Sequence, residues 1–155
     1  MRIGLIAVLL AALPATSPSQ SHNRAQMVIP PTFSLVISTK EATIKAGSEV
    51  RMEIAITNIT DHPIKIAVGP GTYPYLLDVR DADGNLAPET AYGHEMRIEK
   101  NGMTLADTLE PGQTEKLECV VSEWNDLTAG TYFIQVQRWR HPNVKSNKLT
   151  ITVIP

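Results

Sequence analysis

Apolar side chains recur at every second position along most of the chain beyond its N-terminal part. In EVRMEIAITN, residues 49–58, the side chains of Val50, Met52, Ile54 and Ile56 fall on one face. Successive side chains of a strand point to opposite faces, so this period of two predicts a strand with one face buried. The same alternation marks further runs at 63–68, 75–81, 116–121, 131–137 and 148–153.

Glycine-containing turn signals separate these runs, and no stretch has the period of an amphipathic helix. Asp-Gly and Asn-Gly supply the positive φ angles that tight hairpin turns need. About seven to nine short strands with turns between them predict an all-β fold, an antiparallel immunoglobulin-like β-sandwich, over residues 32–155. Residues 86–108 fit this pattern least well. The turn signals are Ala46-Gly47, Asp83-Gly84, Asn101-Gly102, Pro111-Gly112 and Ala129-Gly130.

Two residues at strand boundaries suggest specific roles. Tyr132 begins a strand run, where immunoglobulin-like sandwiches often carry a tyrosine whose hydroxyl ties the preceding corner to the strand. Ordinary core packing is the alternative for Tyr132. Asn58 ends a strand run and also begins Asn-Ile-Thr, an acceptor sequence for N-glycosylation, so a turn role and a glycan site are both open.

The N-terminus has the layout of a secretory signal peptide. A positive residue, Arg2, precedes an apolar run over 3–13, and the small residue Ala15 follows. We therefore expect a signal peptide over 1–15, a flexible polar leader over 16–31, and an exported protein in the periplasm, at the cell surface or outside the cell. The apolar run is shorter than the about 20 residues that span a bilayer, so we expect no membrane span in the mature form. An uncleaved anchor or a buried N-terminal strand is the alternative.

The charge balance limits the classes of partner. The chain has 14 Lys and Arg and 16 Asp and Glu residues. The first 15 residues contain Arg2 and no acid, so the mature chain has 13 basic and 16 acidic groups and a net charge of −3. Nucleic acids and anionic membranes require a basic surface, so we expect neither as a partner.

The sequence shows no catalytic or cofactor motif. The nucleophile elbow, the Walker-type phosphate loop, the H-E-x-x-H zinc motif and paired cysteines are all absent. Cys119 shares a strand face with Leu117 and Val121, which predicts a buried thiol. A single cysteine excludes an internal disulfide. The alternative to a buried thiol is a reactive thiol or a disulfide to another molecule. We expect that the protein is not an enzyme and has no cofactor.

Three segments carry turns and strand starts in a pattern that is found in a known family. They are TNIT at 57–60, GPGTYPYLLDVRDADGN at 69–85 and LEPGQTEKLECVVSEWNDLTAGTYFIQV at 109–136. Over 47–136 the chain resembles the bacterial intracellular proteinase-inhibitor family and, more loosely, other bacterial immunoglobulin-like domains. The resemblance implies a strand that ends at Asn58, a hairpin over 75–84, a turn at Leu109-x-Pro-Gly before a strand, and Trp124 and Ala-Gly-Thr-Tyr before the penultimate strand.

Two departures separate this chain from that family. The family pattern has aromatic residues soon after the Asp-Gly turn, whereas this chain has Leu86, Ala87 and Pro88 there. The family is also intracellular by name, and this chain has an export signal. The motifs specify fold better than activity, so protease inhibition is a hypothesis and no inhibitory residue is transferred.

The stretch WRHPNVKSN at 139–147 is the strongest candidate for a binding loop. Trp139, Arg140 and His141 begin it, and Trp and Arg are enriched in binding hot spots. Loops on rigid sandwiches commonly carry recognition. The alternative is that Trp139 packs over the end of the sandwich while Arg138 and Arg140 keep the strand soluble.

Topology predicts which other residues share this pole. If the strands run up and down in sandwich order, His62 and the turn at 81–83 join Trp139 there. His62, His141 and an aspartate could then hold a metal ion, which is one alternative function. The segment GPGTYPY presents Tyr73 at the opposite pole, as a further contact residue.

These observations predict an exported, non-catalytic binding or assembly module. Its partner would be a protein or an envelope polymer, recognised through loops at one pole of the sandwich. An exported protease inhibitor is the first alternative, with a protease as the partner, and a metal-binding domain at the His62 and His141 pole is the second.

Overall fold

The structure is a computed structural model that describes residues 30–68, 75–98, 105–139 and 141–155. The predicted signal peptide and nearly all of the predicted leader lie outside these ranges. The described part contains ten strands and two helices. In chain order they are β1 Phe33–Ser38, β2 Thr43–Lys45, β3 Arg51–Asn58, β4 Ile64–Val68, β5 Tyr75–Asp81, α1 Ala91–Ile98, β6 Leu105–Leu109, β7 Thr114–Val120, α2 Val121–Trp124, β8 Gly130–Arg138, β9 His141–Lys145 and β10 Leu149–Ile154.

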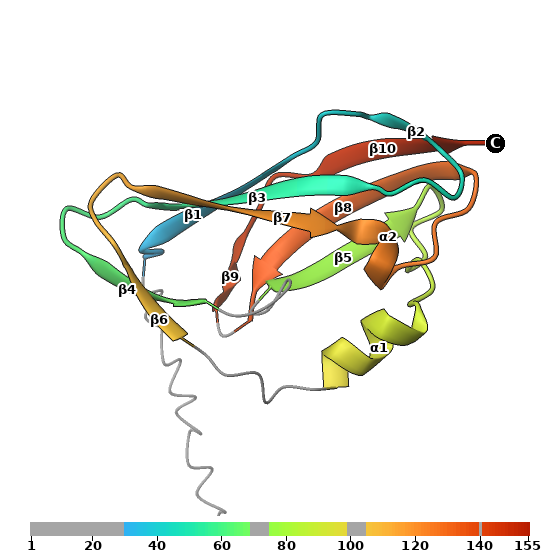
Figure 1. Ribbon diagram of the computed structural model, residues 1–155. Coiled ribbons are helices and arrows are strands. Elements are labelled where there is room, and N and C mark those ends of the chain that lie inside the picture. Colours follow the sequence, from blue (N-terminus) through green and yellow to red (C-terminus); the bar gives the residue numbers. More distant parts are fainter. Residues whose placement is uncertain (1–29, 69–74, 99–104, 140) are drawn as a thin grey trace, which may run out of the picture.

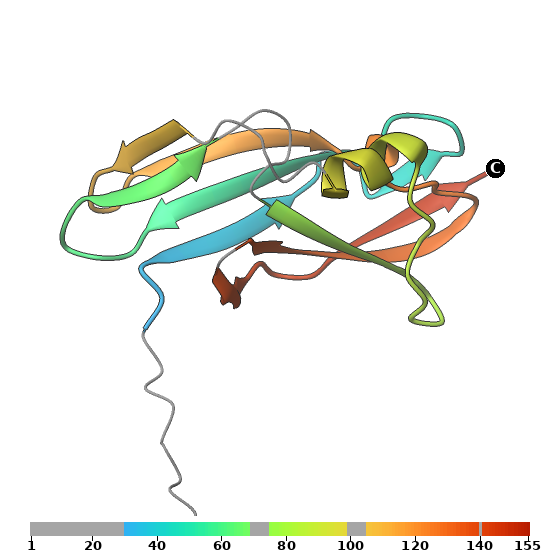
Figure 2. The same ribbon diagram turned by 90° about the horizontal axis from the view of Figure 1, so that it is seen from below.

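The strands form the two facing sheets of an immunoglobulin-like β-sandwich and one separate ribbon (Figure 1). Sheet A has the order β1-β3-β7, and sheet B has the order β2-β10-β8-β5, with β9 paired to β8. The ribbon consists of β4 and β6, and Figure 2 shows the same layers from below. The predicted all-β sandwich is confirmed. The strand count exceeds the expected seven to nine because the pattern of apolar residues did not resolve the short strands β2, β6 and β9.

The period of two buries one face of each main strand, as predicted. In β3, Met52, Ile54 and Ile56 expose no more than 2% of their surface. From sheet B, Ile134 and Val136 of β8 are fully buried. Each such aliphatic side chain contributes roughly 1.5–3 kcal/mol when it is removed from water. The rest of the buried core includes Phe33, Leu35, Ile37, Val50, Val79, Leu109, Cys119, Val121, Ile151 and Val153.

The first strand of the sandwich is divided between the two sheets. β1 pairs antiparallel with β3 in sheet A, whereas β2 pairs parallel with β10 in sheet B. Between them the hydroxyl of Thr39 donates to the carbonyl of Arg51 at 2.8 Å, which fixes the point where the chain leaves sheet A. Gly47, with a φ of 80°, turns the chain after β2.

Tyr132 ties down the corner before β8, as predicted. Its hydroxyl accepts the backbone N–H of Thr128 at 3.1 Å and lies 3.3 Å from the Thr128 hydroxyl. The ring is buried at the same time. The hydroxyl contact thus goes beyond the ordinary core packing that was the alternative.

Asn58 holds the point where the β3–β7 ladder gives way to the β4–β6 ribbon. Its side chain is 1% exposed. Nδ2 donates to the carbonyls of His62 and Leu109, each at 2.9 Å, and Oδ1 accepts the N–H and the hydroxyl of Thr60. The acceptor sequence for glycosylation is therefore occupied by a buried amide that uses all of its hydrogen-bonding capacity in the fold.

Among the described residues the structure contains two short helices, although no stretch of the sequence has the period of an amphipathic helix. α1 begins after Thr90, whose side-chain oxygen accepts the N–H of Gly93 at 2.9 Å. α1 then packs on α2 so closely that a Cβ on Gly93 would lie 2.2 Å from the carbonyl oxygen of Trp124. Both helices are shorter than the windows of about 11 residues or more in which a helical period is recognised. Neither helix is long or apolar enough to cross a membrane, and no other described residues form one that is.

Candidate functional site

The predicted binding loop is largely a hairpin. β8 ends at Arg138 and β9 begins at His141, and these two residues face each other in the ladder. The register then shifts by a bulge, so that Gln137 pairs with Lys145. The expectation of one long loop over 139–147 is therefore wrong, because residues of β9 add to the edge of β8. Arg140 lies outside the described residues.

Arg138 is the central residue of this end of the molecule. It is 4% exposed, and its guanidinium carbon lies 5.7 Å from the ring centroid of Phe33 and 5.1 Å from that of Tyr75. Nη1 donates to the Tyr75 hydroxyl at 3.1 Å, and Nη2 donates to the carbonyl of Ala67 in β4. One side chain thereby connects sheet A, sheet B and the β4–β6 ribbon.

The idea that Arg138 keeps the strand soluble is wrong. Ile134, Val136 and Arg138 occupy alternate positions of β8 and share its inner face. The burial of Arg138 could have been predicted from the sequence, because the period of two places Arg138 on the buried face. A charged residue at such a position is retained where it finds hydrogen bonds and aromatic rings.

Tyr75 and Glu115 complete the polar part of this interior. Burial raises the pKa of Tyr75, against the smaller opposite effect of the Arg138 charge. The phenol therefore stays protonated at neutral pH. Glu115 of β7 lies close enough for its carboxylate to influence Tyr75, and its Oε2 atom is buried without a hydrogen-bond partner. The cluster can hold a hydrogen-bond network, but it contains no activated nucleophile.

Two of the predicted binding residues lie on the surface above this cluster. His141 is exposed, and its ring packs edge-on against Phe33 with a centroid distance of 5.2 Å. Trp139 is half-buried and makes contacts of its own. The β8–β9 hairpin therefore presents side chains from a base that the buried Arg138 supports.

His62 lies at the same end of the sandwich as His141, as predicted. β1 and β3 pair so that Phe33, the neighbour of His141, stands opposite Asn58, which bonds the His62 carbonyl. The His62 ring is exposed and its Nδ1 lies 2.9 Å from Asp61 Oδ1, a contact that lowers the pKa of Asp61. Within the described ranges, no three His, Cys, Asp or Glu side chains gather closely enough to hold a metal ion.

The turn at 81–83 and Tyr75, the last residue of GPGTYPY, lie at the reverse ends from those expected. β5 and β8 are antiparallel neighbours, with Tyr75 opposite Arg138 and Asp81 opposite Tyr132. The Asp81 turn therefore lies away from Trp139, and Tyr75 lies beside the Trp139 end. The prediction was wrong because it let both strands run toward one pole. Tyr73 itself lies outside the described residues.

Cys119 is buried in β7, as predicted. It is 2% exposed, and burial, with a smaller effect of the Glu123 carboxylate, raises the pKa of its thiol to about 12. The thiolate is the reactive form, so this thiol is unreactive at neutral pH.

We expect Cys119 in the folded protein to resist a thiol-alkylating reagent at neutral pH and to react fully after denaturation. Labelling is followed by mass spectrometry, with Cys119→Ala as the blank. Rapid stoichiometric labelling of the folded protein would contradict the burial and would return the reactive-thiol alternative.

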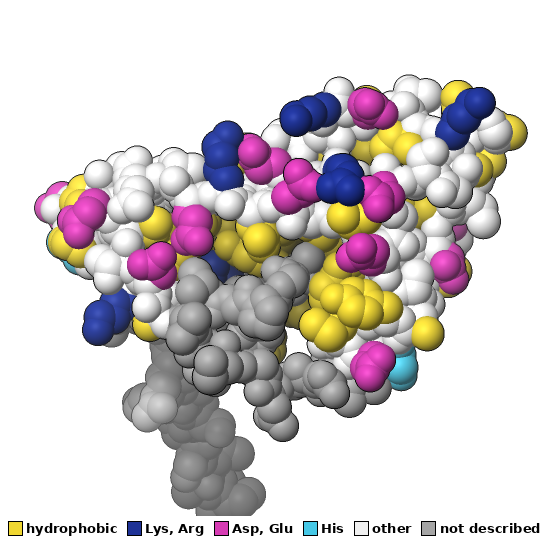
Figure 3. Space-filling view, viewed as in Figure 1, with side chains coloured by type: hydrophobic (Ala, Val, Ile, Leu, Met, Phe, Trp, Pro, Cys, Tyr) yellow, Lys and Arg dark blue, Asp and Glu magenta, His cyan; other side chains and the backbone are white. Residues whose placement is uncertain are grey.

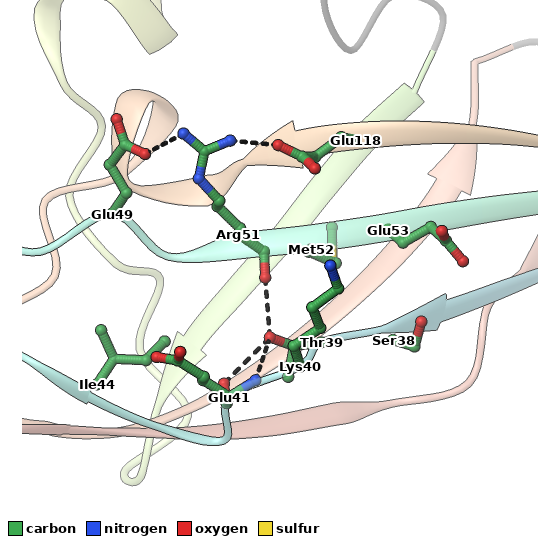
Figure 4. Close-up of a pocket in the computed structure, with 10 residues that line it drawn as sticks. All are labelled: Ser38, Thr39, Lys40, Glu41, Ile44, Glu49, Arg51, Met52, Glu53 and Glu118. Atoms are coloured by element: carbon green, nitrogen blue, oxygen red, sulfur yellow. Dashed lines mark hydrogen bonds and ion pairs between the residues drawn. The ribbon is translucent and has the colours of Figure 1, made fainter.

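A groove that the sequence did not predict lies where the chain crosses from β1 to β2 (Figure 4). Its volume is about 460 Å³. The polar run STKEA at 38–42 interrupts the apolar alternation and was the only sequence sign of this crossing. The groove is lined by Ser38, Thr39, Lys40, Glu41, Ile44, Glu49, Arg51, Met52, Glu53 and Glu118.

The charged groups of the groove largely satisfy one another. Arg51 donates hydrogen bonds to Glu118 and Glu49, which raise its pKa, and Figure 4 shows its guanidinium between the two carboxylates. The Thr39 hydroxyl already donates to the Arg51 carbonyl. These exposed pairs contribute little to stability. The groove does not bring a nucleophile together with a base.

No model of a protein family matches the sequence, and no curated protein matches it. Among solved structures, a β-glucosidase from Erythrobacter marinus is 14% identical with a TM-score of 0.46, covering 79% of this chain and 15% of that one. The CARDB domain of a Pyrococcus furiosus protein, in complex with di-metal ions, is 11% identical with a TM-score of 0.43, covering 79% and 87%. A Listeria innocua β-glucosidase in complex with glucose is 14% identical with a TM-score of 0.45, covering 79% and 16%.

The chain thus spans about 15% of the length of the β-glucosidases that it matches. Identities and TM-scores this low carry no argument about activity. In structure, the chain resembles small β-domains such as the CARDB domain and the immunoglobulin-like regions of β-glucosidases.

Proposed function

We propose that the protein is an exported, non-catalytic binding or assembly module that recognises a protein or an envelope polymer through the β8–β9 hairpin. The observation that carries the proposal is the support beneath this hairpin. Arg138 is held between the rings of Phe33 and Tyr75 and is hydrogen-bonded to the Tyr75 hydroxyl and the Ala67 carbonyl, while His141 next to it is exposed. Side chains presented from a fixed base lose little conformational entropy on binding.

Two further observations support the proposal. The N-terminal sequence has the layout of an export signal. The one thiol, Cys119, is buried and has a raised pKa, so it does not serve as a nucleophile. A specific catalytic turnover by the purified protein would contradict the non-catalytic part of the proposal.

The test is capture of a partner from the source organism's secreted and envelope fraction. We expect the immobilised mature protein to retain a specific partner and the Trp139→Ala/His141→Ala variant to lose it. Tyr92→Ala is the matched control, because Tyr92 is an exposed aromatic residue on α1, away from the hairpin (Figure 1). All three proteins should melt at similar temperatures. Equal capture by all three would exclude the hairpin as the binding surface.

An exported protease inhibitor is the second candidate function. It is favoured by the turns on which the sequence resemblance rests, since Gly84 and Gly112 adopt φ angles of 86° and 74° in the two predicted turns. These turns support the fold more than the activity. Stoichiometric inhibition of a protease, measured across serine, cysteine, aspartic and metalloproteases, would make inhibition the first candidate. No inhibition in any class would remove it.

A further inference from the structure

The described edges of the two main sheets are protected to different degrees, and the edge of β1 is closed at one residue by a side chain. Oδ1 of Asn147 accepts the N–H of Ile37 at 2.8 Å, and Nδ2 of Asn147 donates to the Ile37 carbonyl at 3.0 Å. The amide thereby takes the place of a neighbouring strand at Ile37, near the C-terminal end of β1. An edge whose backbone groups are already bonded is a poor template for another chain.

The other outer strands of sheet B are also partly covered or short. The N–H of Ala87 donates to the Val79 carbonyl of β5 at 2.9 Å, and Arg80 forms a bridge with Leu86. The second half of β5 is therefore covered by the chain that follows it. β2, at the opposite edge, has only three residues.

β7 differs, because among the described residues no strand pairs with the outer edge of this seven-residue strand. The bonds from Val121 N–H to Val50 O and from Asn58 N–H to Gln113 O fix the phase of the β3–β7 ladder. Residues 115, 117 and 119 consequently direct their backbone groups to β3. The backbone groups of residues 114, 116, 118 and 120 point outward, and no described residue outside β7 forms a backbone hydrogen bond with them.

The outer face of β7 carries two exposed charges of opposite sign, those of Lys116 and Glu118. Lys116 Nζ lies 2.9 Å from Glu53 Oε1, and Glu118 is hydrogen-bonded to Arg51. Figure 3 shows basic and acidic groups interleaved along the upper part of this face. Like charges along an edge would repel a second copy of the strand. When two copies of a strand pair antiparallel, charges of opposite sign two residues apart can each stand opposite a charge of the other sign. Such pairs favour association.

We infer that β7 pairs antiparallel with β7 of a second copy of the chain, about a two-fold axis at Leu117. In this register Lys116 stands opposite Glu118 of the second copy, and Glu118 stands opposite its Lys116. These are residues whose backbone groups point outward, so both pairs exchange hydrogen bonds directly. Two three-stranded sheets thereby become one continuous sheet across an isologous interface.

Charge and burial both select this register. If the two-fold axis lay at Lys116 or at Glu118 instead, that residue would stand opposite the same residue of the second copy, and the two like charges would repel. The axis at Leu117 also brings that half-exposed residue of the inner face against its own copy. Glu53, Lys116, Glu118 of the second copy and Arg51 of the second copy then form one row of alternating sign across four strands.

The test is sedimentation of the purified protein over a series of concentrations. We expect a dimer whose dissociation constant rises by at least about tenfold in Lys116→Glu and in Glu118→Lys, because each change places two pairs of like charges in the interface. A mixture of the two variants should restore association as a heterodimer, because one chain then has two acidic side chains that face two basic side chains of the other. Both positions are exposed, so the melting temperatures of the separate variants at low concentration should stay close to that of the wild type.

Lys148→Glu is the matched control, because it makes the same charge change at an exposed position next to β10. It should leave the dissociation constant unchanged. A wild-type protein that stays monomeric at every concentration would overturn the inference. So would charge variants that associate as the wild type does, or a mixture of the two variants that fails to associate. The result is independent of capture by the β8–β9 hairpin, which belongs to sheet B.

Discussion

Arg138→Ala should lower the free energy of unfolding by about 3 kcal/mol. The change leaves the Ala67 carbonyl and the Tyr75 hydroxyl without their donor and removes the cation from between two rings. It also removes the packing of the long side-chain stem. Release of a buried charge opposes these losses and keeps the expected value below their sum. Chemical denaturation followed by tryptophan fluorescence measures the effect.

Two further variants separate the contributions at this position. Arg138→Met restores most of the volume but no donor, so it should recover only part of the loss. Arg80→Met is the matched control, because Arg80 lies on the exposed face of β5 and pairs only with Asp78 and the Gly84 carbonyl among the described residues. It should change stability by less than about 0.5 kcal/mol. If Arg138→Ala is equally mild, Arg138 does not connect the sheets in solution.

Asn58→Ala should destabilise the protein to a similar extent, by about 3 kcal/mol. The substitution leaves the buried Leu109 carbonyl without its donor and the Thr60 N–H without its acceptor, whereas the Thr60 hydroxyl still donates to the His62 carbonyl. Leaving a buried polar group without a partner costs roughly 1–3 kcal/mol, and partial hydration after the change limits the total. Thermal and chemical unfolding check the prediction.

Asn58→Asp tests the role of the amide nitrogen alone. It keeps the oxygen that accepts from Thr60 but loses both donated bonds and introduces a buried charge, so it should also be destabilising. Asn143→Ala, at an exposed position of β9, is the control and should be nearly neutral. If Asn58→Ala and the control have the same free energy of unfolding, the corner between β3 and β4 does not depend on the Asn58 side chain.

The arrangement of β5 and β8 shows why the ends of the sandwich were assigned incorrectly. Alternation identified both strands, and their registers place Tyr75 beside Arg138 and Asp81 beside Tyr132. Direction within a sheet is a property of strand pairing, which the apolar period of either strand alone does not contain. The candidate residues His62 and His141 were correctly placed at one end, since Phe33 contacts His141 and pairs with Asn58, which bonds the His62 carbonyl.

The sequence by itself determined the features that depend on neighbouring residues. The period of two established the buried face of β3, the Gly84 and Gly112 turns followed from their need for positive φ, and Cys119 was expected inside. Tyr132 was recognised because its hydroxyl bonds a residue only four positions away. Such local features are encoded in a few consecutive side chains.

Only the tertiary structure decided what the inward faces meet and which edges stay open. Arg138 was expected to keep its strand soluble, and its burial is tolerable only because Phe33, Tyr75 and Ala67 contact it from three other strands. The closure of β1 by Asn147 likewise joins residues 110 positions apart. Contacts of this kind form when distant strands pack together, and the free energy of a buried charge or an open edge depends on the partners that packing supplies.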